Sequence, residues 1–314
     1  MLLEEELARF TSEKDMLLTI GVFDGVHLGH KYLIGKLVAL AKQQNRLSGV
    51  VTFLQHPREV LSPALRLARL TDPAQKVSLL KNEGVDAVIA LAFIPRMAEL
   101  SARQFVGLLQ KYLRMRGLVV GPDFALGRNR EGNIAFLRKL GEEMGFSVTV
   151  VLPRRMNGMV VSSTAIREAM AGGDITRVNK LLGRPFSLQG RVVSGAHRGG
   201  PLLGFPTFNL DVDSNQALPP DGVYATRTYI DDKVYPSVTN IGRRPTFGEN
   251  ERTIETFILD YQGNLYERQL KIALIERLRD EKRFDSVEEL KQQIADDVER
   301  GRAILASPEY AADR

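Results

Sequence analysis

The sequence has no cysteine and no tryptophan, and none of its apolar runs approaches the length of a membrane span. Without cysteine the chain has no disulfide and no thiolate catalysis, and a zinc site with sulfur ligands is excluded. Basic residues are scattered among acidic ones, and no stretch alternates Lys or Arg with aromatic side chains that could stack on bases. We therefore expect neither a nucleic-acid partner nor a membrane partner.

What the chain does contain is ordinary for a folded protein. Its 314 residues exceed the usual size of one domain, and 44% apolar with 26% charged residues gives no sign of disorder. The formal net charge of +5 suits anionic ligands such as nucleotides. The start, Met1 to Phe10, is acidic and amphipathic, unlike a secretory signal. These features favour a cytoplasmic enzyme with two domains, and they leave its oligomeric state undetermined.

The first half alternates apolar runs with amphipathic patterns of helical period. We expect strands over 17–23, 49–53, 85–91, 118–120 and 147–152, and helices around 33–40 and over 102–113, 133–144, 164–172 and 174–182. This βαβ rhythm predicts an α/β domain with a parallel sheet covered by helices.

From Phe186 onward the pattern changes to short alternating strands separated by Gly, Pro, Asn and Asp. The expected strands cover 187–193, 223–230, 234–240, 253–261 and 269–278. Their spacing indicates a small antiparallel β-barrel, followed by a C-terminal helix with Val287 and Val298 on one face. We place the domain boundary near 183–185, which gives domains 1–184 and 185–314.

The segment from Thr19 to His30 ends an apolar strand, turns through glycines and starts a helix with two histidines. The free N–H groups of a helix N-terminus attract anions, and Gly29 would let a ligand approach the backbone. His27 and His30 are three residues apart and share one helix face. The pair could bind a triphosphate, or the two residues could be ordinary polar groups near a helix cap.

A second helix start lies at Val161 to Arg167 and contains Ser162, Ser163 and Thr164. A plain N-cap uses one hydroxyl, yet three are present, and no Glu or Gln completes a capping box. Arg167 in the first turn opposes the helix dipole unless an anion is bound there. The pattern favours a polyphosphate site over a simple cap.

These two motifs together resemble the nucleotidyltransferase superfamily. The resemblance implies that His27 and His30 stabilise the transferring α-phosphate and the leaving pyrophosphate. It also implies that the triphosphate of ATP is bound by Gly29, Ser163, Thr164 and Arg167. Class I aminoacyl-tRNA synthetases share the first motif, but the chain lacks their Lys-Met-Ser-Lys-like loop.

Further segments resemble the bacterial bifunctional riboflavin kinase/FMN adenylyltransferase family, also called FAD synthetase. They are 51–60, 121–127, 204–209, 221–224, 240–247 and 278–281 with Phe284. The resemblance implies a nucleotidyltransferase domain followed by a six-stranded riboflavin kinase barrel. The barrel would make FMN from riboflavin and ATP, and the first domain would adenylylate FMN to FAD. It further implies Mg²⁺ in both reactions and flavin contacts from His56 and Asp123.

In the second half, Thr207 and Asn209 are two residues apart, so on a strand both side chains face the same way. Their oxygens could bind Mg²⁺ and a phosphate oxygen, or they could form a hydrogen-bonded turn after Pro206.

Glu255 lies inside a largely apolar strand, where a carboxylate needs a partner or a purpose. The resemblance assigns it as the base for the 5′-hydroxyl of riboflavin, and the alternative is an exposed strand residue. Gly195 and Arg198 lie in a segment, 195–204, that would cover phosphates or merely connect two strands.

Three rival functions remain open. One is a single-activity enzyme whose other domain only binds flavin. Another is a flavin-sensing or nucleic-acid regulatory protein, which the presence of the candidate catalytic residues in both domains argues against. The third is an adenylyltransferase for nicotinate nucleotide or phosphopantetheine, which would leave the barrel unexplained.

Overall fold

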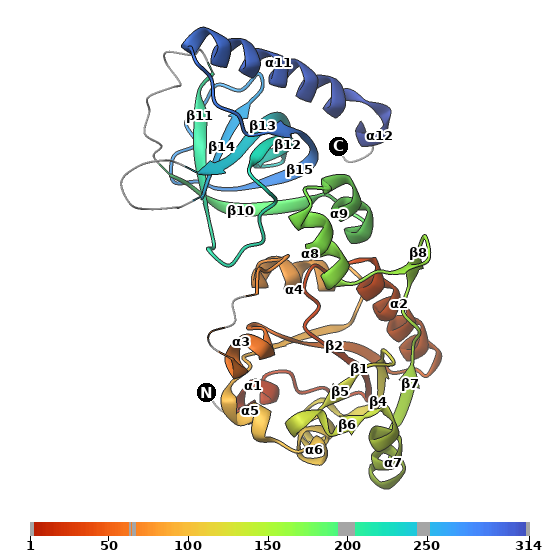
Figure 1. Cartoon of the computed structure of the whole chain (residues 1–314). Helices are drawn as coiled ribbons and strands as arrows, with labels where there is room; N and C mark the ends of the chain where they lie inside the picture. Colours follow the sequence, from red (N-terminus) through yellow and green to blue (C-terminus); the bar gives the residue numbers. More distant parts are fainter. Residues whose placement is uncertain (1–2, 63, 65–66, 194–204, 244–251, 312–314) are drawn as a thin grey trace. The chain divides into compact units, whose positions relative to one another are not determined.

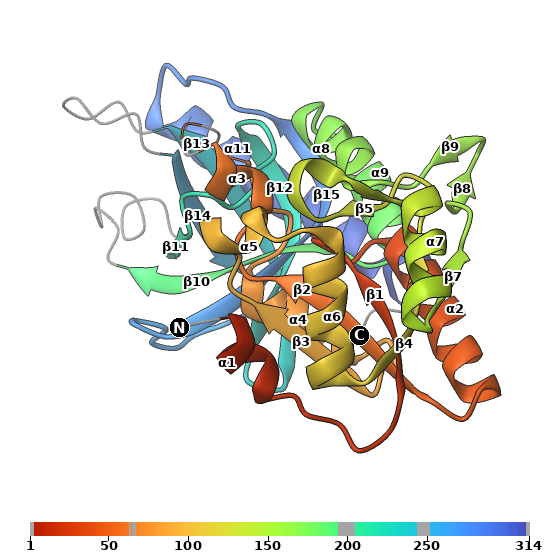
Figure 2. The ribbon, with the colours of Figure 1, turned by 90° about the horizontal axis from the view of Figure 1, so that it is seen from below.

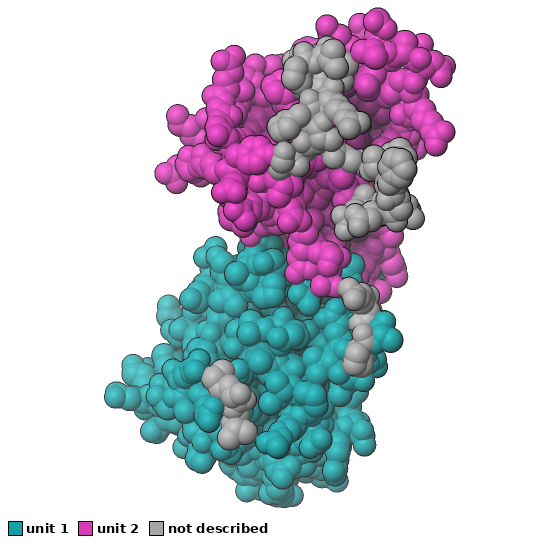
Figure 3. Space-filling model, turned by 90° about the vertical axis from the view of Figure 1, so that its left-hand side faces the viewer, with its two compact units in different colours: residues 1–163 teal, residues 164–314 magenta. Residues whose placement is uncertain are grey.

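A computed structural model of the chain describes residues 3–62, 64, 67–193, 205–243 and 252–311. The chain divides into two compact units, Met1–Ser163 and Thr164–Arg314, which are coloured separately in Figure 3. In the part of the chain that the structure describes, no helix has both the length and the apolar character required to cross a membrane.

The first unit is built on a five-stranded parallel sheet with the order β3-β2-β1-β4-β7. Its strands are β1 (Met16–Ile20), β2 (Leu47–Phe53), β3 (Ala87–Leu91), β4 (Met115–Val120) and β7 (Ser147–Val150). From β1 the chain adds β2 and β3 on one side and then β4 and β7 on the other. The strand order therefore reverses between β1 and β4, which is where open α/β sheets bind ligands, at the carboxyl ends of the strands.

Helices cover both faces of this sheet. Leu17 and Val50 pack on one face with residues of α2 (Leu28–Gln43) and α4 (Pro73–Lys81). Leu18 and Val51 belong to the cluster on the other face, with residues of α1 (Leu3–Ala8), α6 (Ala102–Leu113) and α7 (Ile134–Met144). Figure 2 shows α6 lying across this second face. Apolar residues on both strand faces are expected for a covered parallel sheet, and the predicted fold class of this half is confirmed.

Several short elements of the first unit have no counterpart in the sequence-based prediction. They are α3 (Pro57–Leu61), α5 (Pro95–Glu99), η1 (Arg128–Arg130), the hairpin β5 (Ala125–Leu126) with β6 (Gly132–Asn133), and the hairpin β8 (Arg155–Met156) with β9 (Met159–Val160). None of them is long enough to display a period of its own.

In the second unit, the helices α8 (Ser163–Ala171) and α9 (Ile175–Leu182) precede a barrel. The side chain of Asn179 links α9 to the barrel, because its Nδ2 donates to the carbonyl of Leu274 at 2.9 Å and its Oδ1 accepts from the Phe186 amide at 2.8 Å. The compact second unit includes α9 and all of α8 except its first residue, Ser163. The domain boundary at 184/185 stays a prediction.

The barrel is closed, with six antiparallel strands in the order β10-β11-β14-β13-β12-β15 (Figure 1). The strands are β10 (Phe186–Val193), β11 (Thr207–Val212), β12 (Gly222–Ile230), β13 (Lys233–Arg243), β14 (Arg252–Ile258) and β15 (Gln269–Asp280). They are followed by α11 (Val287–Ala306) and α12 (Pro308–Ala311). The predicted six-stranded barrel with a C-terminal helix is confirmed.

Alternate residues of the barrel strands have different surroundings. Val223, Ala225 and Val238 belong to an apolar cluster with Val298 and Leu305 of α11. Residues of opposite parity on the same strands form a chain of buried hydroxyl groups, linked by hydrogen bonds of 2.8 to 2.9 Å and running through Thr228, Ser237, Thr226, Thr239 and Thr256. Because every hydroxyl in this chain has a partner, the buried polar groups are satisfied without water.

Candidate active sites

The turn between β1 and α2 has an unusual backbone. Phe23, Gly25 and Val26 have φ values of 51°, 86° and 37°, all in the left-handed region. A β-branched residue such as Val26 rarely adopts this conformation. Such residues cost roughly 1 to 3 kcal/mol each and persist only where the surrounding structure holds them. The turn ends at His27, which is the N-cap residue of α2.

His27 is the N-cap of α2, and its Nδ1 accepts hydrogen bonds from the amides of Gly29 at 3.1 Å and His30 at 3.2 Å. The capping interpretation is therefore correct for His27, but it does not exclude phosphate binding. The two donors require an unprotonated Nδ1, so the proton of the neutral ring is on Nε2, where it can donate.

The two imidazoles are stacked, with ring centroids 3.5 Å apart and planes 18° from parallel. The edge of Phe23 contacts His30 at a centroid distance of 5.1 Å. His27 is buried and His30 is half-buried. The prediction that both imidazoles share one face at the helix start is confirmed.

The structure brings the second motif of this half against the first. Ser163, the first residue of α8, donates through Oγ to the main-chain carbonyl of Asp24 at 2.9 Å. A Cβ on Gly29 would lie 2.7 Å from the carbonyl oxygen of Val161, so glycine is required for this close approach. The space next to Gly29 is thus used by the chain itself, and the contact of Gly29 with a ligand stays a prediction. Thr164 and Arg167 follow within α8.

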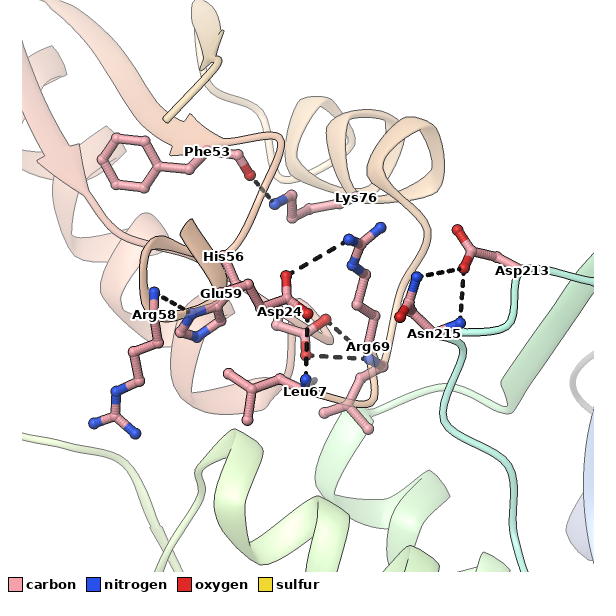
Figure 4. Close-up of polar contacts among 11 residues, drawn as sticks. Asp24, Phe53, His56, Arg58, Glu59, Leu67, Arg69, Lys76, Asp213 and Asn215 are labelled. Atoms are coloured by element: carbon pink, nitrogen blue, oxygen red, sulfur yellow. Dashed lines mark hydrogen bonds and ion pairs between the residues drawn. The ribbon is translucent and has the colours of Figure 1, made fainter. Parts of the chain in front are cut away.

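The two residues predicted to contact flavin follow β2 and β4, the strands on either side of β1 in the sheet. His56 comes shortly after β2 and caps α3, accepting the amide of Arg58 through Nδ1 at 3.1 Å (Figure 4). Asp123 comes shortly after β4 and is exposed, and its carbonyl accepts from the guanidinium of Arg130 at 3.1 Å. Since all strands are parallel, these residues and His27 share the carboxyl edge of the sheet.

Sequence reasoning missed the residues that support the β1–α2 turn. The buried carboxylate of Asp24 accepts from the amides of Leu70 and Thr71 at 3.0 to 3.1 Å, and from the Thr71 hydroxyl at 3.2 Å. The same hydroxyl accepts the amide of Gly25 at 3.1 Å. These contacts join positions 46 or 47 residues apart, and no local sequence pattern indicates such a pairing.

In the barrel, the register of three strands aligns the candidate catalytic residues. Glu255 on β14 lies directly opposite Asn209 on β11 and also opposite Asn240 on β13. Thr207 lies two residues before Asn209 on the same strand, so both face the same way. Asn209 is buried, Glu255 is half-buried and Thr207 is exposed. The alternative of a turn after Pro206 is wrong, because Thr207 and Asn209 lie within a strand.

Two predicted phosphate-binding residues, Gly195 and Arg198, lie outside the described residues. Among the residues that the structure does describe, no group of three or more His, Cys, Asp or Glu side chains is arranged to bind a metal ion. The oxygens of Thr207 and Asn209, beside the carboxylate opposite, remain the candidate ligands in the barrel.

Comparisons with known proteins match both units. Residues 10–165 match the FAD synthetase family, and residues 182–305 match the riboflavin kinase family. The chain is 39% identical over 287 residues to the bifunctional riboflavin kinase/FMN adenylyltransferase of Escherichia coli K12, covering 91% of each. It is 40% identical over 290 residues to the protein of that name from Pseudomonas fluorescens, covering 92% of each.

One solved structure is also similar along nearly the whole chain. It is described as a macrolide-efflux protein from Streptococcus pneumoniae, and it is 30% identical with a TM-score of 0.86. The similarity covers 94% of this chain and 96% of that one. The arrangement of an α/β unit followed by a barrel unit therefore recurs in an experimental structure.

Proposed function

The chain belongs to the family of bifunctional riboflavin kinases/FMN adenylyltransferases, and from this premise we propose which of its residues carry out each reaction. It is an enzyme of FAD biosynthesis that phosphorylates riboflavin with ATP to FMN and then adenylylates FMN with ATP to FAD. The observation that carries this function is the presence of both family matches, 10–165 and 182–305, in one chain.

For the adenylylation, we propose that the first unit acts by positioning and by stabilising charge. A phosphate oxygen of FMN attacks the α-phosphorus of ATP, and the bond to the leaving pyrophosphate breaks. Donors aimed at the phosphate oxygens stabilise the charge of the transition state, and no acid or base is needed. His27 and His30 at the N-terminus of α2 supply such donors.

We also propose that residues around the second helix start bind the triphosphate of ATP. Thr164 offers a hydroxyl group and Arg167 offers a guanidinium. Ser163 and Gly29 lie at the two helix starts, where their own donors bind Asp24 and His27. The contact of Ser163 with the main chain of Asp24 supports this grouping, because it joins the two motifs. His56 and Asp123, at the carboxyl edge of the sheet, are our candidates for contacts with the flavin.

For the phosphorylation, we propose Glu255 as the general base. Its carboxylate accepts the proton of the riboflavin 5′-hydroxyl, the oxygen attacks the γ-phosphorus of ATP, and ADP leaves. The position of Glu255 opposite Asn209 supports this role, because it places the base next to a candidate phosphate ligand. Gly195 and Arg198 are proposed to contact the phosphates of this second ATP.

We propose Mg²⁺ as the cofactor of both reactions. In the barrel, the side-chain oxygens of Thr207 and Asn209 fit it, since Mg²⁺ prefers oxygen ligands and is usually bound by few protein groups together with phosphates. When bound, the ion neutralises charge on the phosphates. Removing divalent ions with a chelator is expected to stop both reactions, and adding Mg²⁺ is expected to restore them; continued turnover in the chelator would contradict the proposal.

The test of the proposed function is chromatography of flavins after incubation of the chain with ATP, Mg²⁺ and either riboflavin or FMN. We expect riboflavin to give FMN and then FAD, and FMN to give FAD directly. FAD formed only from added FMN would favour the rival in which the barrel merely binds flavin. FMN as the sole product would mean that the first unit is inactive, and no turnover would favour a regulatory protein.

The substrates riboflavin, FMN and ATP are the partners that follow from the family. That nucleic acid is not a partner, and that the protein is cytoplasmic, stay predictions from the sequence.

A further inference from the structure

A buried lysine lies next to the ends of two central strands of the first unit. Lys76 on α4 is only 5% exposed, and its Nζ donates to the main-chain carbonyls of Phe53 and Val22, the latter at 3.2 Å. Figure 4 shows the side chain reaching the carbonyl of Phe53. Phe53 is the last residue of β2, and Val22 follows β1. The ammonium group therefore ties together the carboxyl ends of these strands.

The carbonyl of Val22 has a second donor. The hydroxyl of Thr52, a fully buried residue, donates to it at 3.1 Å. Two side chains from different elements thus bind one main-chain oxygen, immediately before the turn that carries the histidines.

A charged group in this position is costly. Burial lowers the pKa of Lys76 to about 8, against the opposing effect of Asp24, while Arg69 lowers it further. Lysine is almost never buried unless it is paired, and an apolar side chain of similar length would fill the same space without this cost. The N–H donors are what distinguish Lys76 from such a side chain.

The turn that follows Val22 needs to be held from outside. It contains two non-glycine residues with positive φ, Phe23 and Val26, and strained backbone of this kind persists only where its surroundings fix it. The segment from Leu70 to Lys76 fixes it at two points. Leu70 and Thr71 donate to the carboxylate of Asp24 inside the turn, and Lys76 donates to the carbonyl just before it.

We propose that Lys76 is a positioning residue for FMN adenylylation: its ammonium donors fix the Val22 carbonyl so that the strained turn keeps His27 and His30 in phosphate-binding geometry. The inference rests on the proposed role of these histidines. It extends the adenylylation site to α4, a helix that lies outside both motifs identified from the sequence and contacts the first of them at Val22.

The test compares Lys76→Met with Lys81→Met, an exposed lysine at the end of the same helix. A displacement of catalytic groups by about 1 Å can cost about 100-fold in rate. We expect Lys76→Met to lower kcat for FAD formation from FMN by about that factor, with a smaller change in KM, because the histidines act in the transition state. FMN formation from riboflavin should be unchanged, and Lys81→Met should leave both activities unchanged. An unchanged adenylylation kcat, or an equal loss of both activities, would overturn the proposal.

A second variant covers the case in which Lys76→Met does not fold. Thr52→Val removes the other donor to Val22 with little change of volume, and we expect a several-fold loss of adenylylation alone. Because the two donors share one carbonyl, their effects should not add. Normal adenylylation by Thr52→Val would count against the proposal.

Nuclear magnetic resonance of the imidazole nitrogens distinguishes a role of Lys76 in positioning the histidines from a role in stabilising the fold alone. The chain has four histidines, so the imidazole nitrogen signals can be assigned by substitution. In Lys76→Met or Thr52→Val we expect the signals of His27 and His30 to shift while that of His56 stays in place; unmoved His27 and His30 signals would contradict positioning. If His30→Ala itself retains adenylylation, the proposed function of the histidines fails instead.

Discussion

The two candidate sites of this enzyme are built in opposite ways. In the first unit, the histidine pair lies on a turn with three positive φ values, and residues 46 to 54 positions away hold that turn. In the barrel, Glu255 and Asn209 lie on regular strands, and strand register alone places them opposite each other. The candidate adenylylation site therefore depends on remote support, whereas the candidate phosphorylation site depends on the alternation and pairing of its strands.

This difference determines from what distance a substitution should change the geometry of each site. A strand holds its side chains through main-chain hydrogen bonds that most substitutions do not touch. A strained turn keeps its shape only through particular side chains, so distant residues can change its chemistry.

Glu255→Gln should separate the two reactions most strongly. Losing the general base is expected to lower FMN formation from riboflavin roughly 100- to 10,000-fold, while FAD formation from supplied FMN stays normal. Flavin chromatography from each starting flavin measures both rates. The matched control is Glu299→Gln on the exposed surface of α11, which should change neither. Equal losses in the two rates would mean that the sites are not separate.

His30→Ala should have the reverse effect. Removing one donor to the transferring phosphate is expected to cost about 100- to 1,000-fold in FAD formation and to leave FMN formation unchanged. Lys36→Ala, an exposed change two turns further along α2, serves as the control. Retained adenylylation in His30→Ala would remove this residue from the site.

The sequence predicts those features of the two candidate sites that depend on local residue spacing, and it does not predict those that depend on the packing of distant segments. The barrel pair was predictable because a period of two relates Thr207 to Asn209, and Glu255 stands out within an apolar strand. The shared face of His27 and His30 was predictable from their spacing on a helix. The partner strands of Glu255 were not predictable, since register depends on the closed barrel.

The support of the first site was also hidden from the sequence. No helix is expected over 73–81 from the sequence, and nothing local indicates that Lys76 is buried against two carbonyls. The positive φ of Val26 is equally unexpected for a β-branched residue. Both features depend on tertiary contacts, and both lie at the site that relies on remote support.

Asp297→Ala should destabilise the barrel unit selectively. Asp297 on α11 is 5% exposed and accepts from the Arg279 guanidinium through both oxygens, at 2.8 to 3.0 Å. Leaving this guanidinium without its carboxylate is expected to cost about 3 to 5 kcal/mol in the free energy of unfolding. Calorimetry should record a transition lowered by about 10 °C for this unit. The exposed neighbour change Asp296→Ala is the control, and equal shifts in both variants would contradict the role of the pair.

The smallest expected effect is a change with pH in the contribution of Lys76 to the free energy of unfolding. The pKa of Lys76 is lowered from 10.5 to about 8 in the folded protein, so the unfolded chain binds more protons between these values. The contribution of Lys76 to stability therefore rises with pH, by about 2 kcal/mol between pH 7 and pH 9.5. Denaturant unfolding of the chain and of Lys76→Met at both pH values measures this rise as a difference. The same pH dependence in both proteins would mean that Lys76 titrates normally.

The central claim is that the two reactions use separate catalytic residues, His27 and His30 for adenylylation and Glu255 for phosphorylation. Mixing two variants that each lack one activity tests this claim most directly. Glu255→Gln and His30→Ala are incubated together with riboflavin, ATP and Mg²⁺, and the flavins are separated by chromatography. Alone, the first variant should leave riboflavin unchanged and the second should stop at FMN. The mixture should form FAD, because FMN released by one variant is adenylylated by the other. A mixture that forms FMN but no FAD, or neither product, would contradict the account.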